Sequence, residues 1–91
     1  MNRNTIKHSK LEMEEDIAKI IFHLHYGNRV LGDVFLDNLK ANAVHLSSKI
    51  QQDVLMFAEQ VHFQHDYDPW HKVTPEVQTA ADQLISDLKL I

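Results

Sequence analysis

The chain of 91 residues contains no cysteine, only two glycines and only two prolines. The absence of cysteine excludes disulfides, thiolate metal ligands and cysteine nucleophiles, and it fits a reducing compartment. Glycine and proline are the residues that most often interrupt regular structure, so their scarcity predicts long helices joined by few turns. The sequence also lacks a glycine-rich loop that could cradle a phosphate group.

Basic charge and long hydrophobic runs are scarce as well. The formal net charge is −4, the reverse of the basic footprint of nucleic-acid-binding proteins, so no nucleic-acid partner is expected. The apolar stretches are far too short to span a bilayer. Residues 11–16 are acidic where a signal peptide would need an apolar stretch. These features predict a cytoplasmic protein with no membrane partner.

One small hydrophobic core is feasible, because 44% of the residues are hydrophobic, and we expect a single helical domain over residues 1–91. Residues 1–8 are expected to form a disordered basic arm. A helix is predicted over residues 10–26, because Ser9 and Glu12 can form a capping box at its start. Gly27 can adopt the left-handed conformation that ends such a helix. The predicted buried face consists of Met13, Ile17, Ile20, Ile21 and Leu24.

Residues 29–63 contain no proline and carry one apolar stripe at helical spacing. Its members are Leu31, Phe35, Leu39, Ala43, Leu46, Ile50, Val54, Phe57 and Val61. A single helix of this length would measure roughly 50 Å, and a dimer would be needed to cover it. The alternative is a break in the region of residues 38–47, where asparagine and serine side chains compete for backbone hydrogen bonds. We narrowly favour the break, with helices over residues 29–41 and 43–63. Asn42 would cap the second of these helices.

The clearest helix start is at Thr74, which suits the N-cap, followed by Pro75 at the first helical position and by Glu76. A helix is predicted over residues 75–90. Its buried face consists of Val77, Ala80, Ala81, Leu84, Ile85 and Leu88. The fold class is therefore all-α, a small antiparallel bundle of three or four helices.

The loop over residues 64–73 holds the only tryptophan, Trp70, between Tyr67 and His71. A loop tryptophan usually folds back as a lid over the end of a bundle. The same residue types also form the anchors of protein interfaces, and the two roles can coexist. We therefore take Tyr67, Trp70 and His71 as candidate partner-binding residues.

Histidines next to this loop suggest a second kind of site. His62 and His65 share a helix face, Asp66 lies one turn beyond His62, and His71 lies across the loop. Three nitrogens and a carboxylate oxygen would suit Zn²⁺, Ni²⁺ or Cu²⁺. Solvated histidines account for the pattern more simply, so the primary prediction contains neither a metal nor another cofactor.

No catalytic motif is recognisable, and an enzyme is not expected. The sequence favours a non-enzymatic protein–protein interaction module, such as a small regulator, an inhibitor or an immunity-type protein, an analogy at the level of fold. The expected partner is another protein, and a homodimer is a further option. The alternative is a His-based protein that binds or senses a transition metal.

Overall fold

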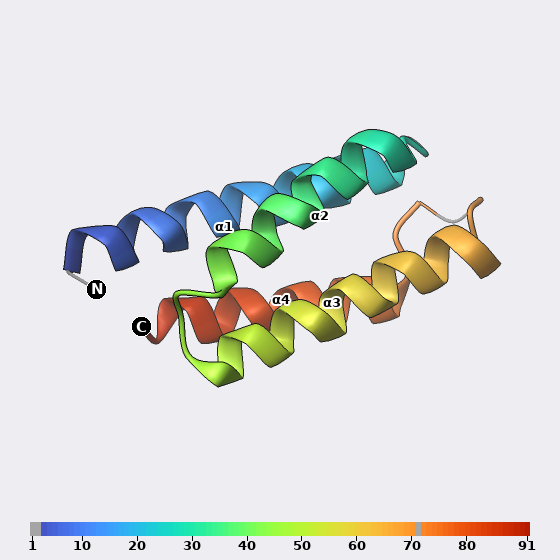
Figure 1. The fold of residues 1–91 in the computed structure, drawn as a ribbon. Helices are drawn as coiled ribbons and strands as arrows, with labels where there is room; N and C mark the ends of the chain where they lie inside the picture. Colours follow the sequence, from blue (N-terminus) through green and yellow to red (C-terminus); the bar gives the residue numbers. More distant parts are fainter. Residues whose placement is uncertain (1–2, 71) are drawn as a thin grey trace.

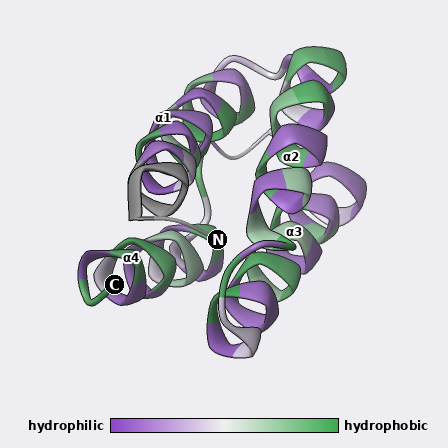
Figure 2. Cartoon of the chain, turned by 60° about the vertical axis from the view of Figure 1, so that its left-hand side comes forward, coloured by the Kyte–Doolittle hydropathy of each residue, from purple (hydrophilic) through white to green (hydrophobic). Residues whose placement is uncertain are grey.

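The computed structural model describes residues 3–70 and 72–91, with side chains from His8 onward. Its four helices are α1 (Arg3–His25), α2 (Arg29–Ala43), α3 (Ser48–Tyr67) and α4 (Pro75–Lys89), and the described residues contain no strand. The helices form two antiparallel hairpins, α1 with α2 and α3 with α4, that pack on each other (Figure 1). Figure 2 shows the four helices nearly end-on, one at each corner of the bundle. The predicted all-α bundle is confirmed, with four helices.

Helix α1 begins earlier than its cap signal predicts. It starts at Arg3, so Ser9 lies buried inside the helix and the predicted capping box is wrong. Residues 3–8 are helical where a disordered arm was expected, and residues 1–2 lie outside the described part of the chain. A capping box marks a place where a helix can begin, but it does not stop upstream turns that lack glycine and proline from joining the helix.

The turn between α1 and α2 is confirmed at Gly27, which has a φ angle of 73°. The Asn28 amide donates to the His23 carbonyl at 2.8 Å, and the Gly27 amide donates to the Leu24 carbonyl at 3.2 Å. These two hydrogen bonds define a Schellman motif, which satisfies carbonyls at the end of α1. The Asn28 side chain then accepts from the Leu31 amide at 3.1 Å and starts α2. The result is a tight antiparallel hairpin.

The predicted break between the middle helices is confirmed, but it lies at residues 44–47 and its cap is Ser47. The Ser47 hydroxyl accepts from the Ile50 amide at 3.4 Å. Asn42, the predicted cap, remains in α2 and donates from its side chain to the Asn38 carbonyl at 3.1 Å. The single long helix is thereby excluded, because the chain turns back between α2 and α3 (Figure 1).

Helix α4 begins as predicted. The Thr74 hydroxyl accepts from the Val77 amide at 3.3 Å, and Pro75 occupies the first turn, where no backbone donor is required. Lys49 connects the two helices of this hairpin. Its ammonium lies 3.1 Å from the Asp53 carboxylate on α3 and 3.5 Å from the Asp87 carboxylate on α4.

The core runs along the inside of all four helices. Its buried hydrophobic members are Met13, Ile17, Ile20, Leu24, Leu36, Leu39, Ala43, Ile50, Val54, Phe57, Ala58, Val61, Val77, Ala81, Leu84 and Leu88. The predicted faces of α1 and α4 are largely confirmed. In α2, however, Leu36 is buried and Leu31 is 41% exposed. The turn at residues 44–47 interrupts the helical periodicity. The single stripe predicted over residues 29–63 therefore consists of two separate buried faces, one on α2 and one on α3. No described helix combines the length and the apolarity that crossing a bilayer requires.

One buried carboxylate in α1 supports a prediction about pH. Burial raises the pKa of the Asp16 carboxyl, the Lys19 ammonium opposes this shift, and Glu12 and Glu15 add to it. The folded state therefore holds this proton more tightly than the unfolded chain, so ionised Asp16 destabilises the fold at neutral pH. We expect Asp16→Asn to raise the melting temperature at pH 7. The gain should shrink as the pH falls through the folded-state pKa and vanish below the ordinary carboxyl pKa of about 4.

Thermal melts followed by circular dichroism between pH 7 and pH 3 would test this expectation. Glu14→Gln is the matched control, because Glu14 lies in the same helix and does not contribute to the pKa shift of Asp16. A gain that persists unchanged at pH 3, or an equal gain in the control, would contradict the role assigned to Asp16.

Candidate functional site

Exposed aromatic residues gather at one end of the bundle. Five of the seven aromatic residues are exposed. They are Phe22, Tyr26, Phe63, Tyr67 and Trp70. All five lie where α1 and α3 end and where the α3–α4 connection begins, at the right in Figure 1. Aromatic side chains contribute strongly to interface energetics, so this concentration marks the end of the bundle as the candidate binding region.

The α3–α4 side of this region is hollowed. An open groove of about 460 Å³ is lined by Glu59, Gln60, Phe63, Asp68, Thr74 and Glu76. A second hollow of about 470 Å³ shares Gln60 and Glu76 with the first and extends along α3 and α4 past Met56 and Ala80. We call the two together the α3–α4 groove. Its described lining residues combine exposed apolar groups with three carboxylates and include no basic residue.

Two of the three predicted partner-binding residues, Tyr67 and Trp70, belong to the end of α3 and to the connection whose Asp68 and Thr74 line this groove. Tyr67 ends α3, is 70% exposed and packs against Phe63, with the ring centroids 4.8 Å apart. Trp70 is 79% exposed, so its role as a lid over the bundle is wrong. The connection is shorter than the predicted loop over residues 64–73, because α3 extends to Tyr67 and α4 begins at Pro75. His71 lies outside the described residues.

Gln64 holds this connection in place. Its side chain is buried, and its amide oxygen accepts from the Thr74 backbone at 2.9 Å. Its amide nitrogen donates to the Lys72 carbonyl at 3.4 Å, and its own backbone carbonyl accepts from the Asp68 amide at 2.8 Å. The loop that carries Trp70 is therefore fixed at both ends by one glutamine.

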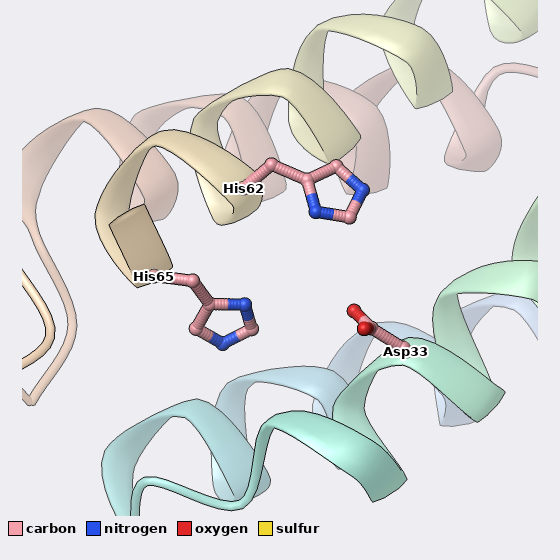
Figure 3. A group of neighbouring side chains, drawn as sticks. All are labelled: Asp33, His62 and His65. Carbon is pink, nitrogen blue, oxygen red and sulfur yellow. The ribbon is translucent and has the colours of Figure 1, made fainter. Parts of the chain in front are cut away.

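Sequence reasoning did not find the acidic residue that faces the histidines. Asp33 of α2 projects across the gap toward His62 and His65 of α3, as Figure 3 shows. One ligand atom from each of these residues lies within 4.8 Å of the other two. The buried Asp33 Oδ1 and both ring nitrogens of His65 have no hydrogen-bond partner among the described residues. This arrangement brings nitrogen and oxygen donors together without satisfying them.

Burial and neighbouring charges shift the pKa of His65. Burial lowers the pKa of the His65 imidazole, the Arg29 guanidinium lowers it further, and the Asp33 carboxylate opposes the shift. Arg29 itself pairs with Asp66 at 3.1 Å, which joins α2 to α3 across the same gap. Asp66, part of the alternative metal-binding set in the sequence, therefore points to Arg29 and is not a member of the group.

This end of the bundle therefore carries two candidate sites. One is an apolar aromatic surface suited to a protein, and the other is a set of nitrogen and oxygen donors suited to a cation. The sequence could not indicate that Asp33 lies near His62, because the position of Asp33 along the bundle relative to His62 depends on how α2 packs against α3. Comparison of the chain with family models, with curated proteins and with solved structures found no match.

Proposed function

We propose that this chain is a non-enzymatic cytoplasmic protein that binds another protein through the α3–α4 groove and the aromatic residues beside it. The observation that carries the proposal is the exposure of Tyr67 and Trp70 next to a groove that Phe63 lines. Large exposed apolar groups are costly unless a partner covers them, and Trp and Tyr are enriched among the residues that dominate binding. A regulator, an inhibitor or an immunity-type protein would use such a surface.

The charges of the groove define the chemistry of the partner. Glu59, Asp68 and Glu76 flank the apolar lining, and no lysine or arginine lies among the lining residues that the structure describes. Complementary potentials favour encounter with a positively charged surface. The partner surface is therefore an amphipathic segment that pairs an apolar face with lysine or arginine, of the kind that docks into a groove between helices.

The connection that presents Trp70 is held in place before binding. Gln64 fixes the backbone at Lys72 and Thr74, so little conformational entropy is lost when a partner engages the loop. Tyr67 and Phe63 lie on one helix and support each other, which further limits the cost of ordering them.

The proposal is tested by capture of partners from native cell lysate with the wild-type chain and with Phe63→Ala and Trp70→Ala. We expect each variant to weaken capture of the same partner by roughly 30-fold or more, the effect of removing a residue that dominates an interface. The melting temperature should change little, because both side chains are exposed. The double variant Glu59→Gln and Glu76→Gln should weaken capture more at low salt than at high salt, because salt screens the attraction between exposed charges.

Leu55→Ala is the matched control, since Leu55 is an exposed apolar residue of α3 that lines a different hollow, the one shared with α2. Capture that survives in all the variants, or that Leu55→Ala also abolishes, would contradict the assignment of the site. Light scattering coupled to gel filtration distinguishes self-association. A dimer that Phe63→Ala converts to a monomer would identify a second copy of the chain as the partner.

A further inference from the structure

We propose that Asp33, His62 and His65 form a binding site for a divalent first-row transition cation, with Zn²⁺ as the representative ion. Two imidazole nitrogens and one carboxylate oxygen are brought to within 4.8 Å of one another from two different helices. The site is independent of the α3–α4 groove, because it lies between α2 and α3 (Figure 3).

The spacing needs only small adjustments to accept a metal. Ligand atoms around a tetrahedral Zn²⁺ at about 2.0–2.1 Å lie roughly 3.3 Å apart, so any pair would close by at most about 1.5 Å. His62 and His65 are three residues apart and project from one face of α3. Rotation about their side-chain torsions, with a similar movement of Asp33, can supply this closure without moving the helices.

The unsatisfied donors argue that a ligand belongs here. Asp33 Oδ1 and both ring nitrogens of His65 are shielded from water, and no residue that the structure describes offers them a hydrogen bond. A buried polar atom without a partner costs about 1–3 kcal/mol, and three such atoms around one gap are unusual in a small domain. A cation held by Asp33 Oδ1 and one His65 nitrogen would satisfy two of them at once.

The donor set selects the class of ion. Imidazole nitrogen suits Zn²⁺, Ni²⁺ and Cu²⁺, whereas Mg²⁺ and Ca²⁺ prefer oxygen ligands alone. Three protein ligands leave at least one coordination position for water or for a group from another molecule. His62 is partly exposed, so solvent reaches this edge of the site.

The position of the site gives the ion a structural effect. Asp33 belongs to the α1–α2 hairpin, and the histidines belong to the α3–α4 hairpin. Among the described residues, the ion pair that joins α2 to α3 at this end of the bundle is Arg29–Asp66, which is half-exposed and therefore weak. A bound cation would tie the two hairpins together and stabilise the folded state.

Titration of the purified full chain with Zn²⁺ at pH 7.5, by calorimetry and by thermal melting, tests the proposal. We expect one saturable equivalent and a melting temperature higher by on the order of 10 °C when free Zn²⁺ is about 100 times Kd. Mg²⁺ should produce no shift. Asp33→Asn, His62→Gln and His65→Gln should each weaken binding by at least ~10-fold, the smallest loss caused by disturbing even an outer partner of a metal ligand.

The controls are Asp37→Asn, an exposed carboxylate one turn along α2, and His45→Gln, an exposed histidine near the opposite end of the bundle. Both should bind Zn²⁺ as the wild-type chain does. A second test uses the native chain, so it remains decisive if a ligand variant fails to fold. It follows the histidine ring resonances by NMR during a titration with Ni²⁺. Selective broadening of His62 and His65, with His45 unaffected, is the expected result. Absence of saturable binding, full affinity in Asp33→Asn, or equal broadening of His45 would overturn the proposal.

Discussion

Replacement of Phe57 by alanine should cost about 3–5 kcal/mol of folding free energy. Phe57 is fully buried in the middle of α3, and its ring belongs to the core shared by the four helices. The expected loss is a large fraction of the roughly 5–15 kcal/mol that stabilises a domain of this size. Urea unfolding followed by circular dichroism would measure it, and the melting temperature should fall by about 12 °C or more.

Phe63→Ala is the matched control for this experiment. It removes the same side chain from the same helix, but Phe63 is 58% exposed, so its replacement should change the stability by less than about 0.5 kcal/mol. Similar losses in the two variants would show that the division between the core face and the binding face of α3 is wrong. The two phenylalanines thus separate stability from the proposed binding function.

Replacement of Gln64 by leucine should cost about 1–3 kcal/mol. Leucine is close to glutamine in size and would fill the buried space, but it can neither accept from the Thr74 amide nor donate to the Lys72 carbonyl. Both backbone groups would lose the partner that holds the α3–α4 connection. Hydrogen exchange should therefore accelerate at Thr74 and in the first turn of α4, while the amides of α1 stay protected.

Gln52→Leu provides the comparison, since Gln52 is an exposed glutamine of the same helix. Its stability and exchange rates should match those of the wild type. A Gln64→Leu variant with unchanged exchange at Thr74 would mean that the loop is held by other contacts. In that case the ordered presentation of Trp70 would lose its structural basis.

Much of the architecture could be predicted from short stretches of sequence. Gly27 ends α1 because only glycine adopts φ of 73° without strain, and Thr74–Pro75 starts α4 through a hydroxyl cap and a residue that needs no donor. Each of these interactions acts within about four residues, so its effect does not depend on how the rest of the chain packs. The apolar faces of α1 and α4 followed from periodicity for the same reason.

The less accurate predictions depended on competition between local signals. Ser9–Glu12 resembled a helix start, yet the helix continues upstream to Arg3. Asn42 was the predicted cap of the third helix, but the chain uses Ser47. Propensity ranks such alternatives within a fraction of a kcal/mol, so packing of α2 and α3 on the rest of the bundle decides between them.

The sequence by itself determined that this protein is helical, where its last helix begins, and that its tryptophan lies in the connection before that helix. Only the tertiary structure decided that Trp70 is exposed beside a groove and that Asp33 faces His62 and His65. The physical reason is the range of the interactions. Caps and periodicity act within a turn or two of helix, whereas the exposure of a side chain and the meeting of residues 29 positions or more apart are set by how the two hairpins pack against each other.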